Sequence, residues 1–138
     1  MKYLVMVQGS QASYAAMAGK ASEGNPAWSE KELQAMFEFM GAVNNDLAES
    51  GELLDGNGLS DPAETRFVLA GKDGRPVITD GPYSETKEVV AGYWLLECES
   101  LDRVTEIASR VAACPVPKGS VPTPVVIRTI PEVHPLED

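Results

Sequence analysis

A long amphipathic helix over about residues 30–50 is the clearest element that the hydrophobic pattern predicts. Apolar residues recur there at three- and four-residue steps, and the stripe consists of Leu33, Met36, Phe37, Met40, Val43 and Leu47. Ser29 and Glu32 have the spacing of a capping box at the start of this helix. Gly51 supplies the stop.

A second apolar stripe begins after Ser100 and ends before Pro115. Its members are Leu101, Val104, Ile107, Ala108 and Val111, again at helical spacing. Ser100 can cap this helix, and Pro115 ends it because proline cannot continue the hydrogen-bond pattern. The sequence therefore predicts two amphipathic helices.

Stretches rich in β-branched and aromatic residues predict the strands. They are residues 2–8, 65–71, 76–80, 88–99 and 123–130, while residues 51–59 form a short strand or a turn. Asp73-Gly74, between the second and third stretches, is a strong hairpin signal. The stretch 88–99 is expected to be central in the sheet.

Residues 9–28 have a weaker pattern. One helical turn fits around residues 14–17, but two glycines and a proline interrupt it. This segment is therefore expected to be a surface excursion. Residues 131–138 form a tail, and the 138 residues fit a single domain.

The order of the elements predicts an α+β fold. Strand, helix, strand pair, strand, helix and strand follow one another, as in a ferredoxin-like split βαβ sandwich with an antiparallel sheet. Two helices can cover only one face of such a sheet. Alternate residues of 88–99 and 123–130 are then left on an uncovered face. Because an exposed apolar face favours association, a homodimer through this face is predicted.

Composition narrows the classes of function. The formal net charge of −10 disfavours a nucleic-acid surface, since phosphates would repel it. The apolar run at the start is too short for a signal peptide or a membrane span, and the two cysteines do not resemble a secreted disulfide framework, so a cytoplasmic protein is expected. His134, the one histidine, lies in the tail and cannot form a usual zinc site with two distant cysteines. Neither a metal nor a cofactor is predicted.

The decapeptide TDGPYSETKE, residues 79–88, concentrates turn-forming and ionisable residues. Gly81 tolerates a positive φ, and Pro82 restricts the backbone before it. Asp80 can accept hydrogen bonds from N–H groups two positions on, as an Asx turn. The first half of the decapeptide therefore has the chemistry of a strand exit.

The second half of the decapeptide carries charges that a turn does not require. If it is extended, Glu85 and Lys87 point to one side, and Thr86 and Glu88 point to the other. Solvated ion pairs explain such charges without any function, as turn chemistry explains Asp80.

Two functional interpretations of this region stay open beside that structural one. In the first, it binds a small ligand, and the candidate ligand-binding residues are Asp80, Tyr83, Lys87 and Tyr93. Lys87 would then be the point charge of a clamp, formed with Glu85, on a small anionic ligand. In the second, it carries acid–base chemistry, and the candidate catalytic residues are Asp80, Tyr83 and Glu85. An acid–base role requires a pKa moved toward neutral by burial or by a like charge.

Three runs of the sequence resemble one protein family: MKY at the start, ITDGPYSETKE at residues 78–88 and GYWLLE at residues 92–97. They are similar to the DGPF-motif branch of the YCII-related proteins, with Tyr83 in place of the usual phenylalanine. The resemblance covers most of the chain and implies a dimeric α+β barrel of ferredoxin-like subunits. It also implies an accessory role beside sigma factors of the extracytoplasmic-function type.

The resemblance does not transfer a reaction to this chain. In the YCII-like branch, a histidine on the long helix and an aspartate are the proposed acid–base pair. Alignment on the run SGELL places Met40 where that histidine stands, and methionine cannot transfer a proton.

Two hypotheses follow. One is a dimeric module that binds a small molecule or a partner protein, tied to transcriptional regulation and without a reaction of its own. The alternative is a cofactor-independent lyase or isomerase that uses Asp80 with Glu85 or Tyr83. A closed pocket that touches Asp80 and Tyr83 would favour the enzyme, whereas a solvent-facing turn would favour the module.

Overall fold

The computed structural model describes residues 1–81 and 83–132 and contains a four-stranded antiparallel sheet in the order β2-β5-β1-β6. Its strands are β1 (Lys2–Gly9), β2 (Leu53–Gly58), β5 (Val89–Glu97) and β6 (Val126–Ile130). The main helices are α2 (Glu30–Glu49) and α3 (Leu101–Ala112). This order of strands and helices is compatible with a ferredoxin-like α+β fold. As predicted, β5 lies inside the sheet.

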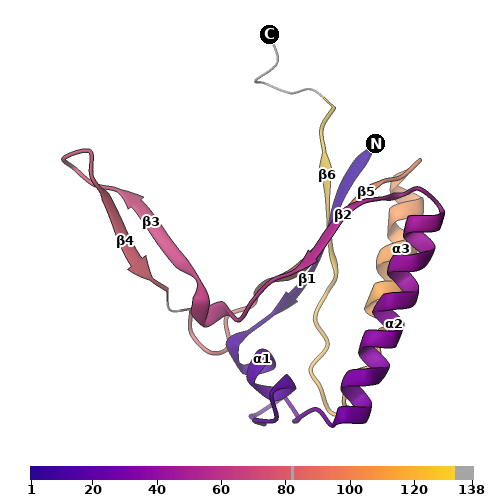
Figure 1. Ribbon diagram of the computed structural model, residues 1–138, viewed down its shortest axis with the longest axis horizontal. Coiled ribbons are helices and arrows are strands. Elements are labelled where there is room, and N and C mark those ends of the chain that lie inside the picture. Colours follow the sequence, from indigo (N-terminus) through magenta and orange to yellow (C-terminus); the bar gives the residue numbers. More distant parts are fainter. Residues whose placement is uncertain (82, 133–138) are drawn as a thin grey trace.

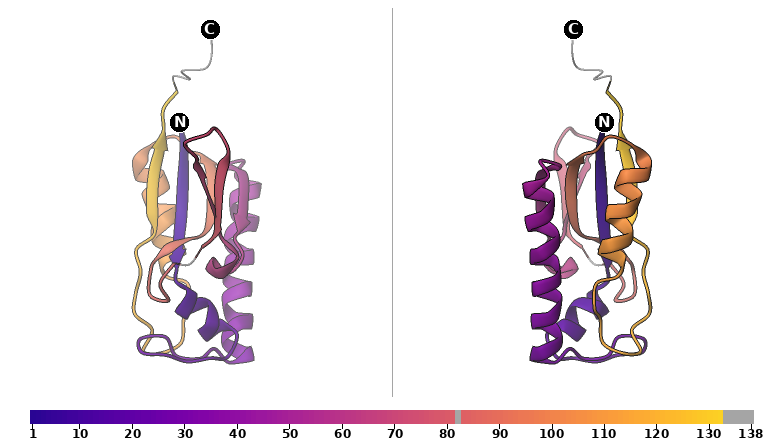
Figure 2. Two further views of the ribbon diagram at one scale, coloured as in Figure 1. Left: turned by 90° about the vertical axis from the view of Figure 1, so that its left-hand side faces the viewer. Right: turned by 90° about the vertical axis from the view of Figure 1, so that its right-hand side faces the viewer.

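Both main helices lie on one face of the sheet, which confirms that expectation (Figures 1 and 2). The hydrophobic core fills the space between these two layers. It consists of Tyr3, Val5, Trp94, Leu96 and Cys98 from the strand layer, Val43 and Leu47 from α2, and Val104, Ile107, Ala108 and Val111 from α3. Cys98 is a buried free thiol, so it serves as a small apolar core residue.

The helix α2 begins and ends where the sequence predicts, because its caps are local. The Ser29 hydroxyl accepts a hydrogen bond from the Glu32 N–H at 3.1 Å, and the Glu32 carboxylate accepts one from the Ser29 N–H at 2.8 Å. Gly51, beyond the last turn, has a φ of +79°, which glycine adopts without steric cost.

Only the C-terminal half of the α2 stripe packs into the core. Val43 is 0% exposed and Leu47 is 3% exposed, whereas Phe37 is 63% exposed. Figure 1 shows the reason: α2 diverges from the sheet toward its N-terminal end. The first half of the stripe therefore does not have the burial that its spacing suggests.

Two ion pairs fasten α3 to its neighbours at the end where α2 meets the sheet. The Arg103 guanidinium donates to both carboxylate oxygens of Glu52, which directly precedes β2, at 2.9 and 2.8 Å. Arg110 lies 2.7 Å from Asp46 of α2. Together with the buried residues of the core, these contacts define the closed end of the space between α2 and the sheet.

The segment 9–28 differs from the expected surface excursion because it contains a helix, α1 (Gln11–Met17), with two buried alanines. Ser10 caps α1 with its side chain. A Cβ atom at Gly9 would lie 3.2 Å from a ring carbon of Tyr14, so glycine here allows α1 to pack tightly against the end of β1. The glycines that suggested a loop begin only after α1 ends.

The strands β3 (Arg66–Ala70) and β4 (Pro76–Asp80) form a hairpin of their own, preceded by the short 3-10 helix η1 (Pro62–Glu64). The predicted turn is confirmed, and Gly74 has a φ of +80°. The hairpin projects away from the four-stranded sheet (Figure 1). Its side chains Val68, Leu69, Val77 and Ile78 are 48% to 67% exposed. Val68 pairs with Ile78, and Leu69 pairs with Val77, so both faces of the hairpin are apolar.

The helices leave the other face of the four-stranded sheet uncovered. On that face Leu4 pairs with Leu95, and Met6 lies between Tyr93 and Val126. All five side chains are half-buried. This is the apolar face that the element order predicts, and association through it stays a prediction.

Candidate ligand-binding site

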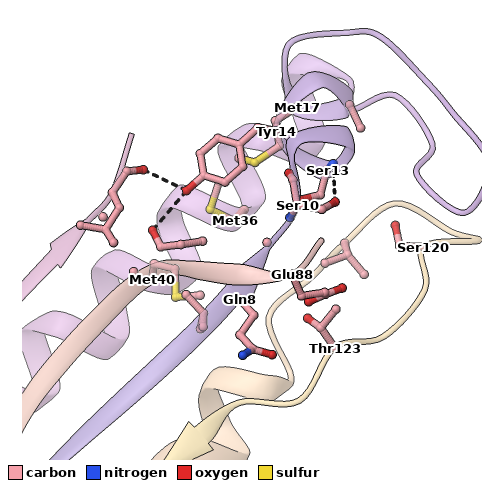
Figure 3. Close-up of a pocket in the computed structure, with 18 of the residues that line it drawn as sticks. Gln8, Ser10, Ser13, Tyr14, Met17, Met36, Met40, Glu88, Ser120 and Thr123 are labelled. Atoms are coloured by element: carbon pink, nitrogen blue, oxygen red, sulfur yellow. Dashed lines mark hydrogen bonds between the residues drawn. The ribbon is translucent and has the colours of Figure 1, made fainter. Parts of the chain in front are cut away.

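A cavity of about 910 Å³ lies where α2 diverges from the sheet. Its wall is formed by the middle of α2, by α1, by the end of β1, by β2, by the first half of β5 and by the connection between α3 and β6. Figure 3 shows side chains from these elements around one space. The cavity therefore arises because the first half of α2 has no sheet residues packed against it.

The side of the cavity formed by α1, α2 and the segment between them is apolar. Met17, Trp28, Met36, Phe37 and Met40 line it. Three of these are methionines, whose unbranched thioether side chains adapt to ligands of different shape and contact aromatic rings favourably. Met40 stands where the resemblance places a histidine, and its side chain is part of this wall.

Several polar side chains in the wall already have protein partners. The Trp94 indole N–H donates to the Asn44 side-chain oxygen at 2.7 Å. The Tyr14 hydroxyl donates to the Leu59 carbonyl at 2.9 Å and to the Ala91 carbonyl at 3.3 Å (Figure 3). These groups fix the wall.

The Tyr14 hydroxyl is held in its neutral form. Burial, with a smaller contribution from the negative charge of Asp61, raises the pKa of Tyr14 above its ordinary value. The hydroxyl is therefore a hydrogen-bond donor at neutral pH and a poor proton acceptor.

The decapeptide contributes Thr86 and Glu88 to the cavity. Strand register places Glu88 beside the end of β1, because Gly9 pairs with Val89. Figure 3 shows Glu88 with Gln8 and Thr123 toward one end of the cavity, and Met17 and Met36 toward the other. The charged side chain thus lies at one end of the site, the polar end, whereas the methionines at the other end lie beside Ser13 and Tyr14.

Thr86 and Glu88 were not among the candidate residues predicted from the sequence, although a signal for them was present. In an extended chain they point away from the side occupied by Glu85 and Lys87. The position of α1 determines which side of the decapeptide faces the cavity. The Ala12 N–H of this helix donates to the Glu85 carbonyl at 2.9 Å and so fixes the decapeptide against the cavity.

Most of the candidate residues chosen from the sequence lie elsewhere. Asp80 and Tyr83 are not among the described residues that line the cavity, and the same holds for Glu85 and Lys87. Tyr93 does line it. The Tyr93 hydroxyl donates to Asp55 at 3.0 Å.

Asp80 is a solvent-facing residue at the end of β4. Its side chain is 79% exposed, and its carboxylate accepts a hydrogen bond from Arg66 at 3.3 Å. The Asx turn expected of Asp80 is wrong, because residue 82 is a proline and has no backbone N–H to donate. An exposed ion pair is the role that the structure gives this residue.

Tyr83 and Gly81 form a packing cluster with Phe67 of the hairpin. The Tyr83 and Phe67 rings meet edge to face, with centroids 5.2 Å apart. A Cβ atom at Gly81 would lie 2.7 Å from a ring carbon of Phe67, so any residue other than glycine would force the Phe67 ring to shift. This part of the decapeptide therefore connects the hairpin to the body of the protein.

The described residues contain neither a metal-ligand cluster nor a membrane-spanning helix. Within 1–81 and 83–132, no three His, Cys, Asp or Glu residues are grouped so that they could hold a metal ion. No helix in the same residues is long and apolar enough to cross a membrane. His134 and most of the predicted tail lie outside the described residues.

Comparison with known proteins identifies the family of this chain. The YCII-related domain matches residues 1–127, which is most of the chain. This chain belongs to the YCII-related family. It is 30% identical over 95 residues to an uncharacterized protein of Rhizobium meliloti (strain 1021), an alignment that covers 69% of this chain and 76% of the relative.

Proposed function

We propose that this YCII-related protein binds a small, mainly apolar molecule in the cavity between α2 and the sheet and performs no reaction on it. The cavity volume of about 910 Å³ supports this proposal. Pockets for small ligands generally have volumes of about 300–1,000 Å³, apolar walls and a few polar groups. The cavity has all three properties.

The exposure of Phe37 is the observation that carries the proposal. Phe37 belongs to the apolar stripe of α2 but is 63% exposed, and it lines the cavity together with Met36 and Met40. Removing apolar surface from water contributes about 25 cal/mol per Å². A ligand in this space would cover the side chains that the sheet does not reach.

The placement of ionisable groups supports binding over catalysis. The acid–base candidates Asp80, Tyr83 and Glu85 do not line the cavity in the described structure. Asp80 faces solvent, which is the arrangement expected of a binding module. A lyase or isomerase would need an acid and a base within hydrogen-bond reach of one bound molecule.

The two tryptophans provide a direct test. Trp28 and Trp94 are the two tryptophans of the chain, and both line the cavity. Titration with small aromatic compounds should therefore change the intrinsic fluorescence in a saturable way. An unchanged fluorescence across a broad panel, with unchanged melting temperatures, would refute the proposal.

A matched pair of variants tests whether the ligand binds in the cavity. Phe37→Asp introduces a charge into the apolar wall at an exposed position, so the fold should be retained. Ala42→Asp introduces the same charge at an exposed position of the same helix outside the cavity wall. Binding should be lost in the first variant and kept in the second. Equal effects of the two would place the ligand elsewhere.

A second part of the proposal is that two copies associate through the uncovered sheet face, as expected of the DGPF-motif branch and its dimeric barrels. The apolar side chains of this face and the exposed apolar hairpin support it. A standard protein interface buries about 800 Å² per partner, and apolar residues dominate its centre.

Sedimentation of two charge variants tests this association. Met6→Lys adds a charge at the centre of the uncovered face and should give a monomer. Ala112→Lys, at an exposed position at the end of α3, should leave the dimer intact. A wild-type protein that sediments as a monomer would refute this part.

A link to sigma-factor-dependent transcription is the third part, and it rests on the family resemblance alone. The net charge of −10 argues against direct contact with DNA. Such a role would therefore act through a protein partner. Co-purification with a sigma factor tests it, and its absence at native expression levels would count against this part.

A further inference from the structure

We propose that the cavity selects an organic cation, in which an amine or a quaternary ammonium group is attached to an apolar body of aromatic size. This inference rests on the proposed function, because it concerns the ligand of the same cavity. The charge would lie beside Glu88, and the apolar body would contact the methionines of α1 and α2.

The charge inventory of the cavity is the first argument. Glu88 is the one charged side chain among the described residues that line it, and no lysine or arginine of that set does so. Lys87 precedes Glu88 in the chain but does not line the cavity. An anionic ligand would therefore meet a carboxylate and no compensating cation.

The surroundings of Glu88 are the second argument. Within the described residues, no lysine or arginine nitrogen lies within ion-pair distance of its carboxylate, and neither does the amino terminus. Gln8 and Thr123 lie near it at the polar end of the cavity (Figure 3). Their side chains provide neutral acceptors for the N–H groups of an amine. A bound ammonium group would thus gain both a charge partner and hydrogen-bond acceptors.

The aromatic and thioether lining is the third argument. Trp28 and Phe37 line the cavity on the side formed by α2 and the segment before it, and aromatic rings attract cations and other aromatic groups. The net charge of −10 also raises the local concentration of cations around the protein. Both effects favour a positively charged ligand over a negatively charged one of the same shape.

Three probes with the same apolar body separate charge from shape: phenylbutylamine, phenylbutanol and phenylbutyrate. Their affinities can be measured through the fluorescence of Trp28 and Trp94 or by calorimetry. The amine should bind about fivefold more tightly than the alcohol, which is the upper range for a partly exposed ion pair. The acid should bind more weakly than the alcohol.

Two variants of the decapeptide locate the charge. Glu88→Gln should abolish the preference for the amine, so that the ratio of the amine affinity to the alcohol affinity falls to about one. Glu85→Gln removes the same charge from a neighbouring exposed position that does not line the cavity, so it should keep the preference for the amine. Both positions are exposed, and circular dichroism can verify that both variants are folded.

The outcomes distinguish this inference from the function on which it rests. Equal affinities of the three probes for the wild type, or tightest binding of the acid, would overturn the cation preference and leave a neutral-ligand site. A preference that survives Glu88→Gln would also overturn it. Failure of all three probes to bind would overturn the cation site and count against the proposed binding function itself.

Discussion

Replacing Glu52 with glutamine should lower the free energy of unfolding by about 2 kcal/mol near neutral pH. The Glu52 carboxylate accepts two hydrogen bonds from Arg103 of α3, at 2.9 and 2.8 Å. The Glu52 side chain is 15% exposed, and that of Arg103 is 35% exposed. Hydrogen bonds to charged groups contribute about 1.5–3 kcal/mol, and the partial exposure of Arg103 keeps the expected value below the top of this range.

The effect of this substitution should depend on pH. The hydrogen bonds from Arg103 lower the pKa of Glu52 from 4.5 to about 2. Because the pKa is lower in the folded state than in the unfolded state, the stabilisation is complete above about pH 4.5 and is lost as the pH falls through about 2. The difference in stability between the wild type and Glu52→Gln should therefore narrow across this window.

Urea unfolding of both proteins at a series of pH values measures this difference. Glu106→Gln is the matched control, because Glu106 also contacts Arg103, at 3.2 Å, but its side chain is 69% exposed. An exposed pair contributes at most about 1 kcal/mol. The role given to Glu52 at the closed end of α2 would be contradicted if the wild type and Glu52→Gln differed in free energy of unfolding by the same amount at neutral and acidic pH. It would also be contradicted if Glu52→Gln and Glu106→Gln lowered this free energy equally.

Three further predictions follow from buried groups and close contacts. Asn44→Ala should lower the free energy of unfolding by about 1–3 kcal/mol, because the Trp94 indole N–H loses its acceptor. Chemical denaturation measures this loss, and an unchanged free energy of unfolding would contradict that hydrogen bond. Gly81→Ala should loosen the hairpin, because the new Cβ atom would lie 2.7 Å from a ring carbon of Phe67. Amide hydrogen exchange should therefore increase in the hairpin while the core stays protected. Unchanged exchange in the hairpin would refute this packing. The Cys98 thiol should resist maleimide at pH values well below about 11, because burial raises its pKa to about 11. Mass spectrometry should detect labelling of Cys98 only in urea. Rapid labelling of Cys98 in the folded protein would contradict this burial.

The fold was largely predictable from the sequence because its main elements are specified locally. Ser29 and Glu32 fix the start of α2 through a reciprocal pair of hydrogen bonds between residues three apart. The Asp73-Gly74 turn and the apolar stretch of β5 are equally local signals. Only one turn of α1, around residues 14–17, was predicted, because its seven residues are stabilised by packing against β1 and by the Glu85 carbonyl, which lies far away in the sequence.

The candidate site was much less predictable. The periodicity of α2 shows which residues share a face but does not show where that face leaves the sheet, so Phe37 and Val43 look equivalent in the sequence. The decapeptide attracts attention through Asp80 and Lys87, yet the residues that reach the cavity are Thr86 and Glu88. The difference depends on tertiary contacts, chiefly those between α1 and the start of β5.

The methyl groups of the methionines offer the most direct test of ligand binding in the cavity. The chain has five methionines, of which Met17, Met36 and Met40 line the cavity, whereas Met1 and Met6 do not. Isotope labelling of the methionine methyl groups gives one nuclear magnetic resonance signal for each, and substitution by leucine assigns them. On addition of phenylbutanol, the three cavity signals should shift in a saturable way while those of Met1 and Met6 stay in place. Unchanged cavity signals, or larger shifts of Met1 and Met6, would contradict a binding site between α2 and the sheet.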